Sequence, residues 1–383
     1  MSTPKFNRPR VPTHYYIWFE PPDEAGDEIL RFASTHRRIK LKGTAFREFQ
    51  QRVIPLLDGR HTLAEIQAQV ADVFSSADIE AGLQLLAENN LLRDGSAGDL
   101  SDDAGSRLTP QLNFFHEMEM NTEDIQARLK LATVSILGLG GAGAGTVQAL
   151  AAAGVGYLRC LDAEKVAPAD TYLSSIFSLS EVGELRTDVL TRRISGTNPD
   201  VTVSTQTRLP ENDDQVLELI SGSDFVLNCL DAGQSSLIYK LNRTCLSANI
   251  SWSSCSIEGP EVVIGPTVVP FETACYLCYK MRSVACAGNP EEEFAFETFL
   301  DRRKRDDSAQ RESLVFGVGV AANLLSLEAV KALSGVLTLS ARGRIVVLDL
   351  LTLESTKHVV LRKPWCPACF KTRGELTRTA SAG

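Results

Sequence analysis

The chain has 383 residues, of which 44% are hydrophobic and 23% charged, a composition that is ordinary for a soluble protein of two or three domains. Its formal net charge of −9 argues against a broad nucleic-acid or membrane surface, because such surfaces are basic. No apolar run reaches the roughly 18 residues of a membrane span, and no apolar stretch follows the basic start of the chain, as a secretory signal would require. We therefore expect a cytoplasmic protein with neither a nucleic-acid nor a membrane partner.

The first 94 residues predict a small α+β domain. Strands are expected at 14–20, 28–34 and 37–43, which are rich in aromatic or apolar residues and separated by turn residues. Three helices are expected after them, at 45–57, from the capping-box pattern that begins at Thr62, and at 75–92. Strands followed by three short helices are typical of a winged helix-turn-helix.

Such a domain often binds DNA, but the charges of its third helix argue otherwise. Residues 75–92 contain Asp78, Glu80 and Glu88 and no lysine or arginine, whereas a helix that reads the major groove carries basic side chains. Two other interpretations stay open. The domain either packs on the rest of the protein, or offers the edge of a strand beside a helix to an extended peptide.

A change of composition marks the end of this domain. Residues 95–106 are small or acidic apart from Leu100, which is typical of a linker. The sequence therefore predicts a small winged helix-turn-helix domain at 1–94, a linker at 95–106 and a large α/β domain at 107–383.

The large domain begins with a glycine-rich turn between an apolar strand and a helix. Residues 138–143 fit G-x-G-x-x-G, and the backbone amides at such a helix start favour a phosphate. The next strand ends at Asp162, where a nucleotide ribose would be held. The candidate nucleotide-binding residues of the turn are Gly138, Gly140, Gly141 and Gly143. The motif alone also occurs in NAD-dependent and flavin enzymes, and a tight turn with no ligand has the same sequence.

Four of the nine cysteines form two C-x-x-C pairs about 90 residues apart. The pairs are Cys275 with Cys278 and Cys366 with Cys369. Each pair supplies two thiolates from one turn, and together they can complete a tetrahedral zinc site with no open position for a substrate. We expect a structural zinc ion that ties the C-terminal part of the chain to the body. A redox C-x-x-C is the alternative, and the role of Cys286, in a polar stretch, is left open.

Residues 107–383 resemble the ThiF/MoeB/E1 family of adenylating enzymes. The similarity lies in five stretches that occur in the family's order. They are residues 151–166, which follow the glycine motif and include Asp162, then 181–203, 224–236, the strands before the cysteine pairs, and the helix 317–335. The resemblance implies a Rossmann-like fold with a structural zinc site, a homodimer, and ATP with magnesium as cofactors. It also implies that Asp162 holds the ribose and that Asp231 is linked to magnesium.

The sequence departs from the family at the cations that neutralise ATP phosphates. Pro110 stands where an arginine that reaches into the partner subunit is expected, and Leu173 stands at a second arginine. Asp170 replaces an asparagine, and Arg186 replaces a lysine, still cationic but differently shaped. Because lost cations slow phosphoryl chemistry strongly, we expect a degenerate nucleotide site, in which Asp231 and Arg186 are the remaining weak catalytic candidates. Lys165, Arg192 and Arg193 are nearby cations that would compensate.

A winged helix-turn-helix before such a domain resembles the Ocin-ThiF-like proteins, or F proteins, of bacteriocin and other RiPP pathways. In those, a RiPP recognition element binds the leader of a precursor peptide as an added strand, and a partner YcaO-type cyclodehydratase makes azolines. The resemblance places the groove between strand 37–42 and helix 79–90. The expected contacts are Arg38, Ile39, Lys40, Leu41, Ile79, Leu83 and Leu86. The alternative for the same residues is a solvated strand with its apolar side in the core.

Two functions follow from different classes. The first is a non-catalytic subunit that binds a leader peptide and delivers it to the modifying enzyme. The second is an ATP-dependent adenylating enzyme that activates a carboxylate of the bound peptide. The missing arginines favour the first. A third, NAD-dependent redox chemistry, lacks a recognisable second substrate domain.

Overall fold

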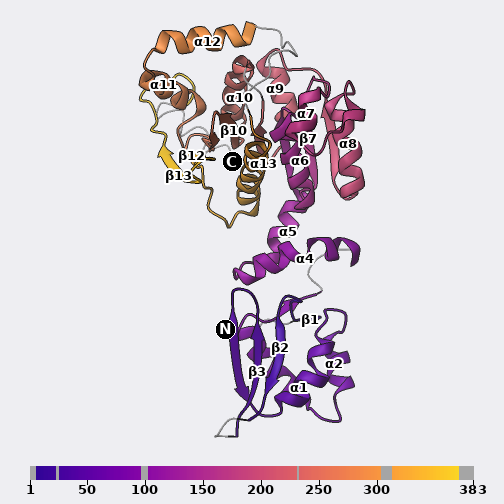
Figure 1. The fold of residues 1–383 in the computed structure, drawn as a ribbon. Helices are drawn as coiled ribbons and strands as arrows, with labels where there is room; N and C mark the ends of the chain where they lie inside the picture. Colours follow the sequence, from indigo (N-terminus) through magenta and orange to yellow (C-terminus); the bar gives the residue numbers. More distant parts are fainter. Residues whose placement is uncertain (1–5, 23–25, 96–101, 231–232, 303–312, 371–383) are drawn as a thin grey trace. The chain divides into compact units, whose positions relative to one another are not determined.

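The computed structural model describes residues 6–22, 26–95, 102–230, 233–302 and 313–370, and for 102–106 the backbone alone (Figure 1). Contacts divide the chain into two compact units, Met1–Ala127 and Arg128–Gly383. The two units are described one at a time below.

The first unit is built on a three-stranded antiparallel sheet with the order β2-β3-β4, and a two-stranded ribbon pairs β1 with β5. Its elements are β1 (Pro9–Arg10), β2 (Tyr16–Glu20), β3 (Glu28–Ala33), β4 (Arg38–Gly43), α1 (Phe46–Arg52), the 3-10 turn η1 (Ile54–Leu56), α2 (Leu63–Gln69), α3 (Ser76–Glu88), β5 (Arg93–Asp94), α4 (Asp102–Glu117) and α5 (Thr122–Leu131), which continues into the second unit. The predicted strands and three helices are therefore present in the predicted order.

Local sequence explains where the helices of this unit begin and end. The capping box at Thr62 and Glu65 forms as predicted, and Ser75 and Asp78 form a second one. The helix expected at 45–57 ends early, at Arg52, and continues as η1. Pro55 is inside η1 and has no amide hydrogen to donate to a preceding turn, so the α-helix cannot run through it.

The first unit extends past the expected linker. Helix α4 begins at Asp102, within 95–106, and residues 96–101 lie outside the described part of the chain. Glu117, at the end of α4, accepts hydrogen bonds from His14 Nε2 at 2.7 Å and from Ser34 Oγ at 2.5 Å. These buried polar contacts attach α4 to the sheet, which explains why the boundary between the units falls at Ala127 and not at residue 106.

A buried histidine on the same helix gives the first unit a pH dependence. Burial, with help from the charge of Arg93, lowers the pKa of His116 to about 4 from 6.5, and its Nε2 donates to the Asn90 carbonyl oxygen at 2.9 Å. Between those pH values the unfolded state binds a proton that the folded state does not, so stability falls as the pH drops from 6.5 to 4.

We expect His116→Gln to remove about 1–3 kcal/mol of this acid destabilisation. The measurement is urea unfolding of the full chain at neutral and acid pH. Wild type and variant share the lowered pKa of Glu117 and its acid dependence, so only the difference between their slopes reports His116. Equal slopes would contradict the prediction.

The second unit is a doubly wound α/β domain, which confirms the predicted fold class. Its eight-stranded sheet has the order β13-β12-β11-β10-β9-β6-β7-β8, with β10, β9, β6, β7 and β8 parallel and the remaining pairs antiparallel. The strands are β6 (Thr133–Leu137), β7 (Tyr157–Leu161), β8 (Thr202–Gln206), β9 (Phe225–Asn228), β10 (Trp252–Glu258), β11 (Glu261–Ile264), β12 (Arg344–Asp349) and β13 (Ser355–Val359). The order reverses between β6 and β9, and ligands of such folds bind at that point.

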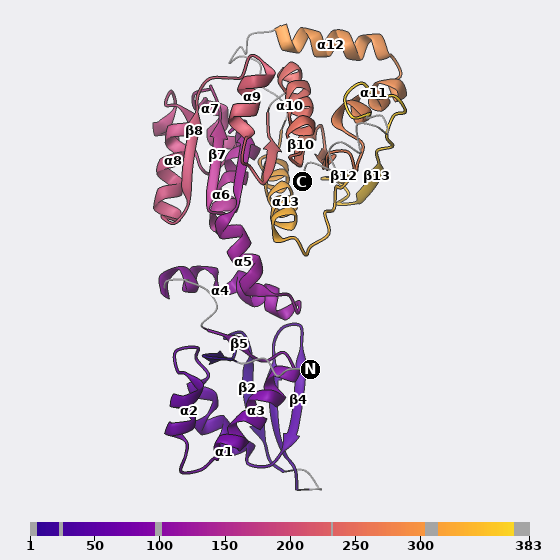
Figure 2. The same ribbon diagram turned by 180° about the vertical axis from the view of Figure 1, so that it is seen from behind.

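Helices cover both faces of this sheet (Figures 1 and 2). They are α6 (Gly141–Ala152), α7 (Pro168–Leu173), the 3-10 turn η2 (Leu179–Glu181), α8 (Arg186–Thr197), α9 (Asp213–Ile220), α10 (Ser235–Ala248), α11 (Tyr276–Cys286), α12 (Pro290–Arg302) and α13 (Val315–Ser334). Helices α6, α8 and α13 pack as one group, and α9 packs with α10. The rule that crossovers between parallel strands are right-handed predicts that these two groups lie on opposite faces.

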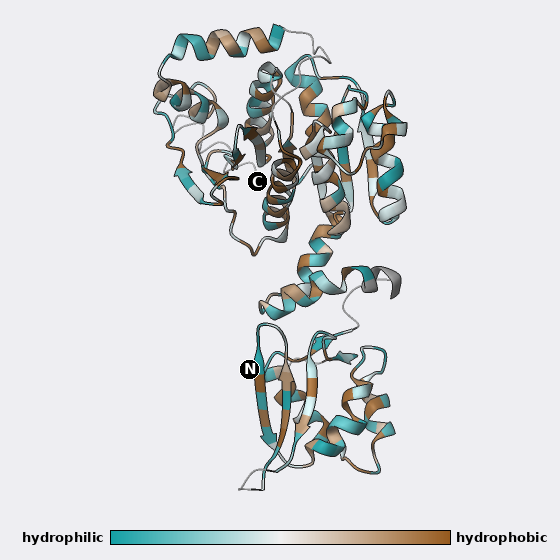
Figure 3. Cartoon of the chain, viewed as in Figure 1, coloured by the Kyte–Doolittle hydropathy of each residue, from teal (hydrophilic) through white to brown (hydrophobic). Residues whose placement is uncertain are grey.

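Helix α13 is the most apolar long helix of the unit (Figure 3). By length and composition it could span a membrane, and it is the one helix within the described residues of which this holds; 44% of its apolar window is buried. It packs closely on α6, because a Cβ atom at Gly145 would lie 2.8 Å from Cβ of Ala322, and Ser326 Oγ donates to the Thr146 carbonyl oxygen at 3.5 Å. These contacts identify α13 as a core helix.

Candidate functional site

The glycine turn lies at the switch point of the sheet, between β6 and α6. Gly138 has φ +88°, and a Cβ atom there would lie 2.6 Å from the carbonyl oxygen of Cys229, the residue after β9. A Cβ atom at Gly143 would collide with the carbonyl oxygen of Gly138. Both glycines are therefore required by the packing of strand, turn and helix, whether or not a ligand binds. Gly140 is the residue before α6 and has extended backbone.

Asp162 follows β7 and is buried, with 5% of its surface exposed. Its Oδ2 accepts from the backbone N–H of Leu139 at 2.6 Å, and its Oδ1 accepts from the N–H of Glu164 at 2.7 Å. Its Oδ2 also lies 3.3 Å from Arg186 Nη1. The carboxylate predicted to hold a ribose is therefore in the predicted place beside the glycine turn, but protein groups contact both of its oxygens.

Arg186 is the first residue of α8 and pairs with a second carboxylate. Its Nε and Nη2 donate to Oδ2 and Oδ1 of Asp170, each at 2.9 Å, in the bidentate geometry that suits guanidinium. Arg186 and Asp170 expose only 2% and 3% of their surface. We name Asp162, Arg186 and Asp170 the buried carboxylate cluster. It holds two carboxylates and one guanidinium, so its formal charge is negative.

Helix α7 carries Asp170 and also covers the start of α6. A Cβ atom at Gly141 would lie 3.1 Å from Cβ of Leu173, 3.2 Å from the Leu173 carbonyl oxygen and 2.7 Å from Cγ1 of Val318. Leu173 occupies a position at which the family pattern has an arginine. The amino end of α6, where a phosphate would approach, thus faces apolar side chains and a carbonyl oxygen.

Two of the three other cations predicted to compensate, Arg192 and Arg193, are engaged elsewhere. Arg192 Nη1 lies 2.8 Å from Glu184, and Arg193 Nη2 lies 3.1 Å from Glu181, both pairs at the surface. Lys165 is exposed, and its backbone forms a bridge with Leu185. Pro110 lies inside α4, in the first unit. Asp231 lies outside the described residues, so its predicted link to magnesium stays a prediction.

A cavity of about 600 Å³ lies next to Asp162 at the carboxyl ends of β7 and β8. Its lining consists of Ala163, residues 207–211, Gln234, Ser236, Leu237 and Lys240. Our sequence interpretation missed residues 207–211 and Lys240, because no motif marks them and only the chain order of the strands brings them to Asp162. A second cavity, of about 640 Å³, lies between α10, α11, α12 and the last cysteine pair.

The four predicted metal ligands come together. All four Sγ atoms lie within 4.8 Å of one another, and all four cysteines are buried. Sγ of Cys275 is 3.9 Å from that of Cys278 and 3.8 Å from that of Cys366, and Sγ of Cys278 is 3.6 Å from that of Cys369. Sulfurs bound tetrahedrally to zinc at about 2.3 Å are about 3.8 Å apart, so the cluster fits this metal.

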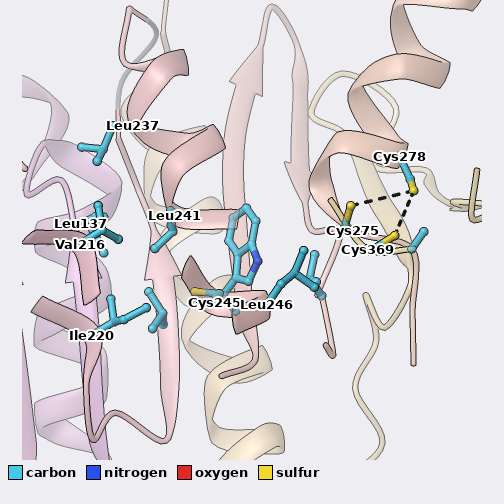
Figure 4. Close-up of a cluster of buried hydrophobic side chains, with 14 of the residues drawn as sticks. Leu137, Val216, Ile220, Leu237, Leu241, Cys245, Leu246, Cys275, Cys278 and Cys369 are labelled. Atoms are coloured by element: carbon cyan, nitrogen blue, oxygen red, sulfur yellow. Dashed lines mark hydrogen bonds between the residues drawn. The ribbon is translucent and has the colours of Figure 1, made fainter. Parts of the chain in front are cut away.

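The cysteine cluster is continuous with the main core of the unit (Figure 4). Cys275 is the residue before α11, and the backbone N–H of Lys363 donates to Cys278 Sγ at 3.3 Å. Leu246, Cys245 and Trp252 are buried in the same hydrophobic cluster. The loop that follows β13 is therefore fastened to the body through sulfur. Cys286 ends α11 and is exposed.

The predicted peptide-binding residues divide into two groups. Four of them are buried in the core of the first unit and do not face solvent: Leu41, Ile79, Leu83 and Leu86. Arg38 and Lys40 are exposed and Ile39 is half-buried. The structure therefore corrects the expectation that apolar side chains of α3 contact a peptide directly. The backbone of β4 and its exposed side chains remain available for such contacts.

A doubly wound sheet with a glycine turn at its switch point and an aspartate after the next strand is the fold of nucleotide-binding proteins. The model of the ThiF family matches residues 109–368, and the chain belongs to this family. A molybdopterin-synthase adenylyltransferase of Salmonella typhimurium is 28% identical, over 64% of this chain and 89% of the relative. The sulfur carrier protein ThiS adenylyltransferase of Escherichia coli is 26% identical, over 64% and 89%.

Solved structures of E. coli MccB share the fold of nearly the whole chain. The crystal structure of MccB with ATP has a TM-score of 0.64 and 18% identity, and covers 94% of this chain and 99% of MccB. The microcin C7 biosynthetic enzyme MccB in complex with N-formylated MccA gives a TM-score of 0.64 at 19% identity, with the same coverage. The common fold thus includes a unit before the ThiF domain.

The fold family implies ATP, and the residues around α6 do not fit its phosphates. The cation nearest to Asp162 is bound by two carboxylates, and the start of α6 is covered by Leu173 and Val318. Phosphate transfer needs cations directed at the phosphates. The buried carboxylate cluster supplies net negative charge instead.

Proposed function

We propose that this protein binds the leader of a ribosomal precursor peptide and delivers it to a partner modifying enzyme, of the YcaO cyclodehydratase type, in RiPP biosynthesis. The observation that carries the proposal is the open edge of β4. Support also comes from the solved complex of MccB, a protein of the same fold, with N-formylated MccA. The departure of the buried carboxylate cluster from phosphate chemistry favours binding and delivery over catalysis.

The edge of β4 is suited to accept an added strand. Among the described residues, β3 is the only strand that pairs with β4. The N–H of Ser34 donates to the Arg37 carbonyl oxygen at 2.9 Å, which closes the β3–β4 turn. In an antiparallel pair, hydrogen-bonded and non-hydrogen-bonded positions alternate. The backbone amides of Ile39 and Leu41 therefore point to β3, and those of Arg38 and Lys40 point to the open edge.

The opposite edge of the sheet is less suitable. Strand β2 is also terminal in the order, but the side chain of Gln50, on α1, donates to the Ile17 carbonyl oxygen at 3.3 Å, and Arg47 lies over the Phe19 ring. Helix α1 thus contacts β2, whereas α3 reaches the β3–β4 turn through a hydrogen bond from Arg37 to the Asn89 carbonyl oxygen (Figure 2). A peptide added to β4 would lie beside α3.

The exposed cations of β4 indicate the chemistry of the peptide. Arg38 and Lys40 alternate on one face, and Lys40 lies opposite Arg31 in the register of β3. In a chain of net charge −9 this is a local positive surface. An acidic segment would be attracted to it, with main-chain hydrogen bonds adding affinity.

A library of displayed random peptides, selected for binding to the full chain, tests this proposal. We expect the selected peptides to be acidic, and Lys40→Glu to lower their affinity at least about tenfold. The charge reversal removes an attraction and adds a repulsion. Lys357→Glu is the matched control, because Lys357 is exposed on the edge strand β13 of the second unit. Binders without acidic residues that tolerate Lys40→Glu would count against the proposal.

Amide hydrogen exchange distinguishes strand addition from simple charge attraction. A bound strand should slow exchange of the Arg38 and Lys40 amides, while those of Ile39 and Leu41 already face β3. Slowing spread evenly over β4, or confined to α1 and β2, would contradict the geometry.

We further propose that the four cysteines hold a structural zinc ion, that the protein is a cytoplasmic homodimer, and that the body presents the peptide to its partner enzyme. The cysteine distances support the metal. Metal analysis and the mass of the protein in solution are the direct measurements.

The second candidate is an ATP-dependent enzyme that adenylates a carboxylate of the bound peptide. One observation favours it: the cavity of about 600 Å³ beside Asp162, with Lys240 in its lining. Its marker is pyrophosphate release that depends on the selected peptide and is lost in Asp162→Ala.

A further inference from the structure

Within the buried carboxylate cluster, protein groups already make hydrogen bonds to the side chains that a nucleotide would otherwise contact. Asp162 accepts from the amides of Leu139 and Glu164 and from Arg186. Asp170 Oδ2 accepts from the Ala167 amide at 2.8 Å as well as from Arg186. Ion pairs buried this deeply are retained only when their hydrogen bonds are met, and here each carboxylate has an amide and a guanidinium partner.

The cluster also determines the position of α7. This helix has six residues, too few to be stable alone. Among its contacts, the bidentate bond from Arg186 to Asp170 is charged and buried, and it connects α7 to the start of α8. The same short helix places Leu173 against Gly141. The position of the cover over α6 therefore depends on Asp170 and Arg186.

We propose that the Asp170–Arg186 pair is an internal lock, which holds α7 over the amino end of α6 and excludes nucleotide from an otherwise complete turn. The lock uses two residues at once, an added carboxylate and a guanidinium that spans both aspartates. It goes beyond the peptide-binding function and does not depend on it, since it concerns the second unit alone.

Opening the lock should restore nucleotide affinity. In the double variant Asp170→Asn with Arg186→Lys, the amide is neutral, and the shorter ammonium can offset Asp162 without the bidentate bond to residue 170. We expect no Mg-ATP binding to the wild-type full chain in calorimetry up to millimolar nucleotide, and at least about tenfold tighter binding by the double variant. The same exchange of chemistry at an exposed bidentate pair, Asp213→Asn with Arg243→Lys, should leave nucleotide affinity unchanged.

The single variant Asp170→Asn keeps the test valid if the double variant does not fold. We expect exchange of the amides of residues 168–174 to become at least about tenfold faster, with α9 unchanged as the internal reference. Micromolar binding of Mg-ATP to wild type that is lost in Asp162→Ala would overturn the lock. So would a folded double variant with no gain in affinity, or unchanged exchange of α7. Peptide binding in the same samples reports the proposed function separately.

Discussion

Replacing Cys369 by serine is expected to destabilise the second unit by several kcal/mol, because structural zinc binding contributes about 10–16 kcal/mol in small zinc domains and one thiolate of four is lost. The effect should spread beyond the last loop. Cys369 is in the same buried cluster as Trp252 and Leu246, so loosening the metal exposes part of the main core (Figure 4). The measurement is thermal unfolding with metal content, before and after chelator.

Cys286→Ser is the matched control, since Cys286 is the exposed thiol at the end of α11. It should retain one metal per chain and an unchanged melting temperature. If wild type holds no metal and Cys369→Ser melts normally, the structural role is wrong. Oxidised C-x-x-C pairs in that protein would instead support the redox alternative.

The sequence predicted the framework because its signals are local or spaced by fixed rules. The capping box at Thr62 depends on residues three apart, and the two cysteine pairs each lie within a single turn of chain. A glycine turn after an apolar strand likewise determines its own backbone, as Gly138 shows by its positive φ. Such features need no tertiary knowledge, and they were predicted at the correct residues.

What the sequence could not predict depends on which residues tertiary packing brings together. Asp170 and Arg186 are 16 positions apart, on different helices, and only the structure shows that they pair, where the sequence showed two separate departures from a family pattern. The assignment of Ile79, Leu83 and Leu86 to a peptide groove was wrong in detail because a local pattern was interpreted as a binding surface. A helical apolar stripe on an amphipathic helix usually faces the core, and the structure buries it there.

These two outcomes together shape the functional interpretation. Four of the seven side chains first assigned to peptide binding are core residues, which leaves recognition to the backbone of β4 and to its exposed cations Arg38 and Lys40. Two of the departures from the family pattern, Asp170 and Arg186, form a buried, hydrogen-bonded cluster with Asp162. The second unit is therefore not an eroded nucleotide site with empty contacts, since its polar groups have new partners.

Replacing Arg186 by methionine is expected to cost about 3–5 kcal/mol, because it leaves Asp162 and Asp170 as two buried carboxylates without their cation. Methionine keeps an unbranched apolar stem but is shorter than arginine, so the cavity left by the guanidinium contributes part of the loss. Urea unfolding of the full chain near neutral pH is the measurement, with the slope checked for two-state behaviour. This loss of free energy is the cost of removing one partner from the cluster. The net contribution of the cluster to stability would be measured by replacing all three residues with apolar ones.

Arg243→Met supplies the contrast. Arg243 makes the same bidentate contact, to Asp213 at 3.1 and 2.8 Å, but both side chains are about half exposed. Exposed pairs contribute about 0–1 kcal/mol, so this variant should be nearly as stable as wild type. If Arg186→Met and Arg243→Met cost the same, burial does not give the cluster its strength, and the lock over α6 would lose its energetic basis. A large difference confined to Arg186 would show that the residues which replaced nucleotide chemistry now stabilise the fold.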